Sequence, residues 1–408
     1  MLNGPQLRVL LLFALGYFVS YVFRGVNLGF APYLLHDLGL SATSLGVLTS
    51  LYFLGFAIAQ IPAGVMLDHF GPRRTVAVLV VVAAAGSITY GEAHSLSGLM
   101  VGRFLIGVGV SACLGGAFKA LAQVFEIRRL PMVNGVVMAI GGLGGVAMGS
   151  PLSWLLTWTD WRSICLSLAL LSVGVAAALW FGAPTDRQRS HQVTLLSQFK
   201  GTWQILNNRS FWKLASLSVV TQGVFYAIQS LWLGPYLHDV AMLPASRASA
   251  MVSLVGISMM VGCLFFGIVA RRLTRIGLNL DRVCGIGMMA FVVTQLLIVL
   301  HAPLPDTLLW TAYGVFGGTG ILTYAIMVEH FPTHMIGRVN TTLNLLLFML
   351  IFAFQIAVGA IVGHWPRVDG HYPAVAHLYA WGALLALQLA SALWYFLPAP
   401  QKQALSTP

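Results

Sequence analysis

The stretch that decides the fold is Gly64-Val65-Met66-Leu67-Asp68-His69-Phe70-Gly71-Pro72-Arg73-Arg74-Thr75, a short polar segment between two long apolar runs. Gly71-Pro72 predicts a turn, because glycine tolerates positive φ and proline fixes φ. Arg73 and Arg74 favour the cytoplasmic side of a membrane, where basic residues accumulate. Asp68 can pair with an arginine or face a helix N-terminus. The stretch therefore predicts a tight cytoplasmic turn between two membrane-spanning helices.

The composition is that of an integral membrane protein. Of the 408 residues, 58% are hydrophobic and 8% are charged, against about 25% charged in soluble proteins. The net charge of +11 does not indicate nucleic-acid binding, because no run of basic residues alternates with aromatic residues on a polar face. The four cysteines lie in or beside apolar runs without a CxxC pair, so we interpret them as packing residues.

Twelve apolar runs are long enough to cross a bilayer, which takes about 20 apolar residues per helix. Their approximate bounds are 8–34, 43–67, 75–93, 98–124, 133–156, 162–184, 212–237, 248–270, 281–301, 306–329, 339–363 and 374–397. The longest polar interval divides them into two sets of six. We expect an all-α membrane protein with an N-terminal six-helix bundle (1–184), a cytoplasmic linker loop (185–210) and a C-terminal six-helix bundle (211–408).

The placement of lysine and arginine predicts the orientation of the chain. With the N-terminus in the cytoplasm, most of the 22 basic residues fall in cytoplasmic segments. Only Arg162, Arg247 and Arg367 fall in loops on the other side. This asymmetry is the positive-inside signal. We therefore expect both termini in the cytoplasm and an even number of spans.

The two halves of the chain repeat one another. Pro32-Tyr33-Leu34 reappears as Pro235-Tyr236-Leu237, at an offset of 203 residues. His36-Asp37 matches His238-Asp239 with a one-residue gap. Because each half has an even number of spans, the sequence predicts a parallel repeat, with a pseudo-two-fold axis along the membrane normal.

The turn motif, the number of spans, the repeat and the long central loop together resemble the major facilitator superfamily. The turn is similar to that family's motif between helices two and three, roughly G-x-x-x-D-x-x-G-R-R/K. The resemblance implies two six-helix bundles that rock about a central substrate, and it implies a transporter that is no enzyme and needs no cofactor. It also implies that the turn gates the cytoplasmic side. The candidate gating residues are Gly64, Asp68, Gly71, Arg73 and Arg74.

The first span holds the clearest candidate for a substrate contact. Tyr17, Tyr21, Arg24 and Asn27 fall at i, i+4, i+7 and i+10, on one face of a helix. An ionisable residue at membrane depth is costly, so its default interpretation is functional. A cation, two phenols and an amide suit an anionic ligand. The alternative is an arginine that pairs with a buried carboxylate, which the absence of any Asp or Glu in mid-span makes weaker.

The surrounding run, residues 20–34, also resembles span one of the organophosphate and organic-anion branches, which have a ligand-binding arginine there. Organophosphate carriers place a second arginine in span seven, but Ala227 stands at the repeat position of Arg24. The resemblance therefore favours a singly charged anion over a phosphate ester.

Further candidates lie on the other spans that line the cavity in this family, namely four, seven, ten and eleven. They are Lys119, Gln222, Tyr226, Gln229, Asn344 and Gln355. Lys119 can line the pathway or extend its side chain to the cytoplasmic surface. The amides can bind substrate or form hydrogen bonds between helices.

We expect a secondary active transporter of a small organic anion or polar metabolite, such as a vitamin, that works by alternating access in the uptake direction. The alternative is a proton-coupled drug or metabolite efflux pump of the same fold, which the glycine-rich fifth span favours. The expected partners of the protein are the substrate, the lipid bilayer and protons as a candidate coupling ion, with no nucleic acid and no metal. The expected setting is a monomer in a bacterial inner membrane.

Overall fold

A computed structural model describes residues 3–126, 129–184, 195–275, 279–331, 335–368 and 370–397. These residues are almost entirely helical, and their only β-structure is a single bridge between Val368 and His371. Within the described ranges, nine helical segments are long and apolar enough to cross a membrane. The predicted all-α membrane fold is confirmed, whereas the count of twelve spans stays a prediction.

The first half of the chain contains a helix of 50 residues that covers two predicted spans. The helices of this half are α1 (Gly4–Asp37), α2 (Ala42–Gly91), α3 (Leu96–Val110), α4 (Cys113–Val124), α5 (Leu130–Ala147), α6 (Ser150–Leu155) and α7 (Trp161–Gly182). At Gly71, φ is 79°, a value that glycine adopts without strain, and this residue separates α2 into two helical parts. Tyr52 and Ala83, one on each part, both approach glycines of α3. The two parts of α2 therefore lie side by side, as the turn motif predicts.

The second half is interrupted in two places by turns that are not α-helical. Its helices are α8 (Leu195–Leu206), α9 (Arg209–Ala227), the π-helical turn η2 (Ile228–Trp232), α10 (Leu233–Asp239), α11 (Ala245–Arg275), α12 (Leu280–Val299), α13 (Asp306–Gly317), the 3-10 turn η3 (Gly318–Gly320), α14 (Ile321–His330), α15 (Ile336–Val362) and α16 (Ala374–Phe396). The predicted linker loop includes α8, but residues 185–194 lie outside the described ranges. The predicted bundle boundaries therefore stay a prediction.

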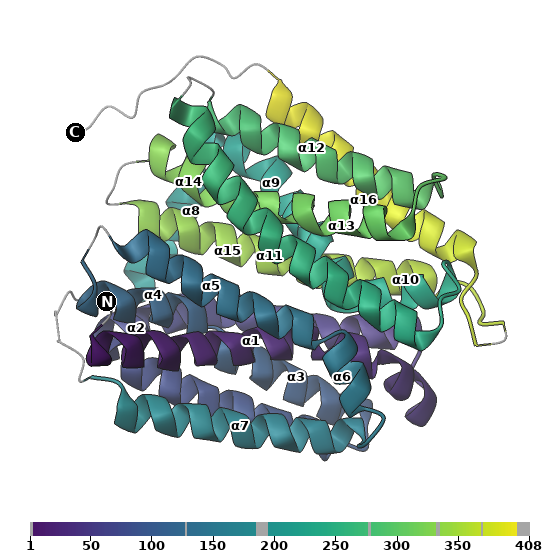
Figure 1. Ribbon diagram of the computed structural model, residues 1–408, viewed down its shortest axis with the longest axis horizontal. Helices are drawn as coiled ribbons and strands as arrows, with labels where there is room; N and C mark the ends of the chain where they lie inside the picture. The colour runs from purple at the N-terminus through teal and green to yellow at the C-terminus, as the bar shows by residue number, and fades with distance from the viewer. Residues whose placement is uncertain are drawn as a thin grey trace.

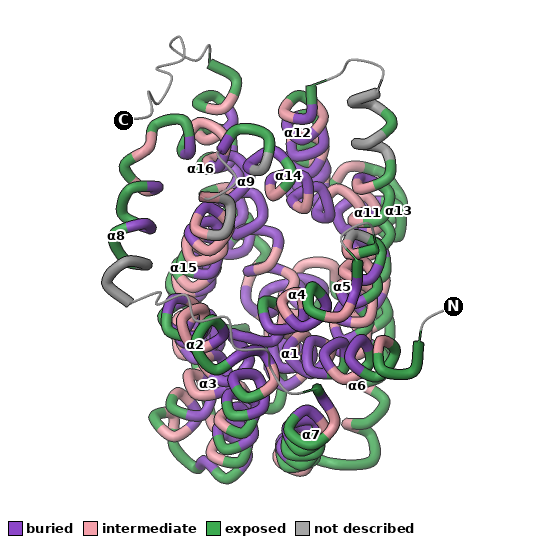
Figure 2. Tube along the Cα trace, turned by 90° about the vertical axis from the view of Figure 1, so that its left-hand side faces the viewer, coloured by how far each residue is buried: buried purple, intermediate pink, exposed green. Residues whose placement is uncertain are grey.

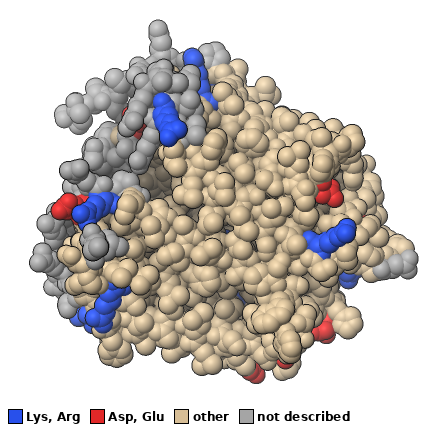
Figure 3. All heavy atoms as spheres, in the orientation of Figure 1, with Lys and Arg blue, Asp and Glu red and all other residues tan. Residues whose placement is uncertain are grey.

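The helices run roughly along the longest axis of the molecule, with the early helices on one side and most of the late helices on the other (Figure 1). The start of α1 and the end of α16 lie toward the same end of the molecule, which we call the terminal end; the opposite end is the distal end (Figure 1). On the face shown in Figure 3, the described Lys, Arg, Asp and Glu side chains lie toward these two ends. The uncharged band between them suits the hydrocarbon layer of a bilayer.

The two halves touch closely at the distal end. A Cβ atom on Gly46 of α2 would lie 2.7 Å from a backbone oxygen of α15 and 3.3 Å from the Cα of Gly359. Thr43 Oγ1 donates a hydrogen bond to the Gly359 carbonyl at 3.1 Å. The Ala42 N–H donates to the Tyr372 hydroxyl at 3.0 Å. Glycine at both positions thus allows backbone contact that holds the distal ends of the halves together.

Candidate functional site

A cavity of about 520 Å³ lies between the two halves. Its described lining comes from α1, α2, α4, α5, α9, α11, α14 and α15, from the last residues of α3 and α13, and from the turns beside them. Figure 2, a view from the terminal end, shows α4, α5, α14 and α15 arranged about the middle of the molecule, and residues of all four helices line the cavity. The lining includes Gly64 and Leu67 of the turn motif. The volume falls within the range of about 300–1,000 Å³ that is usual for small-molecule sites.

Arg24 is the one charged side chain among the described residues that line this cavity. Its guanidinium carbon lies 4.4 Å from the ring centroid of Tyr21, 5.4 Å from that of Tyr226 and 5.3 Å from that of Phe348. The Tyr52 hydroxyl also interacts with it. No Asp or Glu of the described ranges forms an ion pair with Arg24. A buried guanidinium surrounded by rings and hydroxyls retains its full charge for a ligand.

Neutral polar groups from the second half face the same cavity. Gln222 Nε2 donates to the Gly317 carbonyl at 2.8 Å, and the Tyr324 hydroxyl donates to Asn344 Oδ1 at 2.5 Å. Tyr226 lines the cavity beside them, as do Tyr17 and Tyr21 of α1. Of the predicted binding residues, the structure therefore brings six together: Tyr17, Tyr21, Arg24, Gln222, Tyr226 and Asn344. They offer one positive charge and several hydroxyl and amide groups.

Two helices are interrupted beside the cavity. The helix α4 begins at Cys113, directly after Ser111 and Ala112, which line the cavity. In the second half, α14 begins at Ile321, after the cavity-lining glycines of η3. The C-termini of the preceding helices, Val110 of α3 and Gly317 of α13, line the cavity as well. The partial charges of adjoining helix ends oppose each other, so Arg24 remains the main positive group of the described lining.

Asn27, a predicted binding residue, lies outside the described lining of the cavity. Its Nδ2 donates to Thr49 Oγ1 at 3.0 Å, and its Oδ1 accepts from the Tyr90 hydroxyl at 3.0 Å. Both partners belong to α2, one on each of its two parts. The side chain thus links α1 to α2 and has little capacity left for a substrate.

Gln229 and Gln355 also lie outside the described lining. Gln355 Nε2 donates to Ser230 Oγ at 2.8 Å, and Gln229 Nε2 lies 3.9 Å from the Met259 sulfur. These contacts match the second interpretation of the buried amides, as hydrogen bonds between helices. We leave both residues out of the proposed binding site.

Lys119 has a partner that neither of its two predicted interpretations included. Its Nζ lies 2.6 Å from Asp68 Oδ1 and donates to the Leu67 carbonyl at 2.7 Å. The contact joins α4 to the end of the first part of α2, within one half of the molecule. The cation and the acid of the turn motif therefore neutralise one another toward the terminal end, directly beside the cavity-lining residue Leu67.

The other candidate gating residues surround the same turn. Gly64 lines the cavity, and among the described residues no atom outside its own stretch of helix lies within 4 Å of where its Cβ would be. Gly71 supplies the positive φ of the turn. Arg73 donates to the Ala183 carbonyl at 3.3 Å, after α7, and Arg74 is exposed. The turn is thus tied to α7 and α4 of its own half.

Sequence reasoning missed three side chains of α2 that belong to the site. Phe56 and Gln60 line the cavity, and Tyr52 interacts with Arg24. The Phe56 ring stacks on Phe348 from the other half, with centroids 3.9 Å apart and an angle of 12° between planes. Positions 52, 56 and 60 share one helical face, and this spacing was the available signal.

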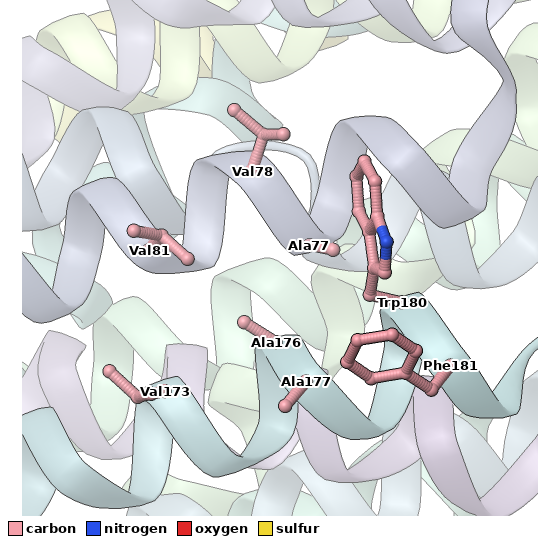
Figure 4. A pocket seen from close by; sticks show the side chains of 8 residues that line it. All are labelled: Ala77, Val78, Val81, Val173, Ala176, Ala177, Trp180 and Phe181. Carbon is pink, nitrogen blue, oxygen red and sulfur yellow. The ribbon is translucent and has the colours of Figure 1, made fainter.

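A second, shallower groove of about 370 Å³ lies between α2 and α7. Figure 4 shows its lining, which consists of Ala77, Val78, Val81, Val173, Ala176, Ala177, Trp180 and Phe181. These side chains offer no charge and only the Trp180 ring nitrogen as a polar group. In a bilayer such a groove suits lipid chains, so we do not assign it to a polar substrate.

Comparison with known proteins identifies the family. The family model of the Major Facilitator Superfamily matches residues 13–355. The chain belongs to the major facilitator superfamily. The resemblance drawn from the turn motif, the repeat and the span pattern is thereby confirmed.

Curated members of the superfamily match part of the chain. The probable sulfoacetate transporter SauU of Cupriavidus necator is 28% identical over 159 residues, which is 39% of this chain and 37% of the relative. The hexuronate transporter of Bacillus subtilis is 27% identical over 181 residues, 44% and 43% of the two chains. The multidrug resistance protein MdtL of Klebsiella pneumoniae is 28% identical over 236 residues, 56% and 58%. The matches to these three thus span 37–58% of the relatives' length.

Solved structures of the superfamily match along the whole length. A bacterial homologue of the human lysosomal transporter Spinster, in an inward-facing and occupied conformation, has a TM-score of 0.74 over 97% of both chains, at 16% identity. A D-xylose–proton symporter has a TM-score of 0.74 over 97% of this chain and 98% of its own, at 14% identity. At these identities the likeness shows the fold alone.

Proposed function

We propose that the protein is a secondary transporter that moves a small organic anion across the membrane by alternating access. The observation that supports this most directly is Arg24, a cation in a central cavity with no carboxylate partner in the described ranges. A single negative charge on the ligand would balance that cation. At about 4 Å and an effective dielectric constant near 20, two opposite unit charges attract by about 4 kcal/mol.

The lining suggests the kind of anion. Four tyrosines, with Phe56 and Phe348, provide ring faces and hydroxyl groups around one guanidinium. We infer a hydroxylated or ring-bearing carboxylate or sulfonate. Relatives that are named for transport of sulfoacetate and hexuronate support this inference, because both compounds are organic anions.

We also propose an orientation and a state. With both termini in the cytoplasm of a bacterium, the distal end faces outward and is held closed by the contact of Gly46 with Gly359. The cavity lining reaches toward the terminal end, so this conformation is inward-facing. The described lining contains no Asp, Glu or His. We therefore infer that any coupling to protons passes through the substrate or through groups at the ends of the helices. We further propose that the protein is a monomer and that it takes up its substrate.

Transport by purified protein in liposomes tests the proposal. A panel of carboxylates, sulfonates and hexuronates, with neutral amides of the same shape, would first be screened by thermal shift, because a bound ligand raises the apparent stability. For the best ligand, Arg24→Ala should lower the affinity about 10- to 150-fold, from the roughly 1.5–3 kcal/mol of a charge-assisted hydrogen bond. Arg24→Lys should recover part of this loss, because it restores the charge without the planar guanidinium.

The matched control is Arg247→Ala, which removes the same charge from an exposed site at the distal end. It should leave affinity unchanged. Equal binding of anion and neutral amide by the unaltered protein, or unchanged affinity in Arg24→Ala, would contradict the role of Arg24.

A drug exporter is the second candidate. The match to MdtL is longer than the two matches to anion transporters described above, and the aromatic lining also suits a flat hydrophobic drug. The two functions can be distinguished by the charge of the ligand, because the described lining of the cavity has one positive charge and no negative one. A cationic dye would be repelled by Arg24, so accumulation or export of such a dye by the unaltered protein would favour the exporter.

A further inference from the structure

Four titratable side chains meet at the distal end of the second half, far from Arg24. The buried carboxylate of Asp239, at the end of α10, lies at the centre. Its Oδ1 is 3.0 Å from His238 Nδ1 and 3.5 Å from His371 Nδ1, and its Oδ2 is 3.1 Å from His377 Nε2. The rings of His238 and His371 stack, with centroids 4.2 Å apart and 15° between their planes.

We propose that His238, Asp239 and His371 form a binding site for a divalent transition-metal ion of the zinc type. One ligand atom from each of the three lies within 4.8 Å of the others. Ligand atoms about 2.0–2.1 Å from a tetrahedral zinc ion are about 3.3 Å from each other. The two nitrogen-to-oxygen distances, 3.0 and 3.5 Å, lie on either side of that value. Imidazole nitrogen and carboxylate oxygen are both usual zinc ligands.

The hydrogen bonds of the cluster leave one ligand atom without a partner. His371 Nδ1 is buried and has no hydrogen-bond partner among the described residues. It faces the same carboxylate oxygen that His238 Nδ1 already occupies. A metal ion bound to the three atoms would give His371 Nδ1 a partner and would replace the hydrogen bond between His238 Nδ1 and Asp239 Oδ1. A buried nitrogen without a hydrogen-bond partner is unfavourable, so the cluster gains from such an ion.

The fourth residue supports the three ligands. His377 is fully buried on α16 and holds the second carboxylate oxygen, which fixes the orientation of Asp239. Ligands of metal sites are usually held by such outer hydrogen bonds. His238 is exposed, so an ion can enter from solvent and keep a water molecule as its fourth ligand.

The position of His371 gives the site a consequence for the closed distal end. The next residue, Tyr372, accepts the hydrogen bond from Ala42 of the first half. A metal ion would fix His371, and with it the adjacent Tyr372, to α10. We infer that the ion stabilises the closed distal end and slows transport, an effect that rests on the proposed function, whereas the metal site itself does not.

Cobalt(II) titration of the purified, tag-free protein tests the site, because a tetrahedral cobalt site absorbs visible light. Visible absorption should appear when cobalt is added to the unaltered protein, and it should disappear when zinc displaces the cobalt. His371→Ala should weaken binding by about tenfold or more. The control is His36→Ala, from the repeat-related pair His36–Asp37, whose side chains are 91% and 44% exposed. Binding that is absent, equally strong in His371→Ala, or lost in His36→Ala would overturn the proposal.

Transport in liposomes separates the two inferences. Zinc on the distal side should slow transport by the unaltered protein, and His371→Ala should abolish this inhibition. If cobalt binds but no anion is transported, the metal site stands and the proposed function fails. If cobalt binds and zinc leaves transport unchanged, the effect on the distal end is refuted.

Discussion

Replacing Gly46 with alanine should destabilise the conformation in which the distal end is closed. The new Cβ would lie 2.7 Å from a backbone oxygen of α15, 3.3 Å from the Gly359 Cα and 3.3 Å from the Trp232 ring. The first two neighbours are backbone atoms, so they can move only if α15 moves. Gly359→Ala should act in the same way, because its Cβ would lie 2.8 Å from the Ala42 carbonyl oxygen.

The size of the effect follows from the cost of overpacking. Forcing one extra carbon into a close-packed contact costs about 1–3 kcal/mol. A conformation with its distal end open lacks this contact and avoids the cost. The equilibrium between the closed and open distal end should therefore shift by about 5- to 140-fold toward the open form, at 1.4 kcal/mol per factor of ten.

Spin labels at His94→Cys and Arg247→Cys measure this shift. Both positions are exposed at the distal end, one on each half, and Cys263 would be replaced by serine because it lines the cavity. Double electron–electron resonance should show longer distances in Gly46→Ala. Gly382→Ala is the control, since no atom lies within 4 Å of its added Cβ. A distance distribution in Gly46→Ala that matches the control would refute the reasoning.

Two further predictions concern polar contacts of the first half. Asn27→Ala should lower the stability by about 1–3 kcal/mol, because the Tyr90 hydroxyl and Thr49 lose their partner; an unchanged melting temperature would count against this. Asp68→Asn and Lys119→Gln should each slow turnover more than they weaken substrate affinity, with the double variant no slower than either alone. Losses that add in the double variant would show that the two side chains act separately. Since the side chains of Lys119 and Asp68 are 34% and 40% exposed, respectively, their ion pair should contribute less than about 1 kcal/mol to the stability.

The sequence predicts the helices well because a bilayer requires long apolar runs, and these are visible without any knowledge of contacts. Helical periodicity likewise placed Tyr17, Tyr21 and Arg24 on one face, and all three line the cavity. Asn27 shares this face but lies about 4.5 Å further along the helix than Arg24. At that depth Thr49 and Tyr90 of α2 take up its hydrogen bonds. Periodicity gives the face of a helix and leaves its neighbours at each depth undetermined.

The partner of Lys119 shows the same limit more sharply. The depth of Lys119 in its span indicates that its side chain either lines the pathway or extends to the membrane surface. Neither interpretation includes a partner for the lysine. Its contact with Asp68 joins residues 51 positions apart, on helices whose relative placement depends on the turn at Gly71. A single sequence contains no signal for such a pair. The aromatic contact of Phe56 with Phe348 was hidden for a related reason, because an aromatic residue in an apolar run can equally face lipid.

The repeat gives both halves a similar framework, yet the proposed anion site draws on them unequally. The cation is Arg24 of the first half, and its repeat position in the second half, Ala227, is a fully buried alanine. Two of the three rings around the guanidinium, Tyr226 and Phe348, belong to the second half. In the proposed transport cycle, an anion bound at Arg24 would therefore keep its charge partner and change its aromatic neighbours as the halves rock. A ligand shifts a conformational equilibrium only by the difference between its affinities for the two states. We therefore expect the charge to determine how tightly the anion binds, and the rings of the second half to determine how strongly binding favours one state over the other.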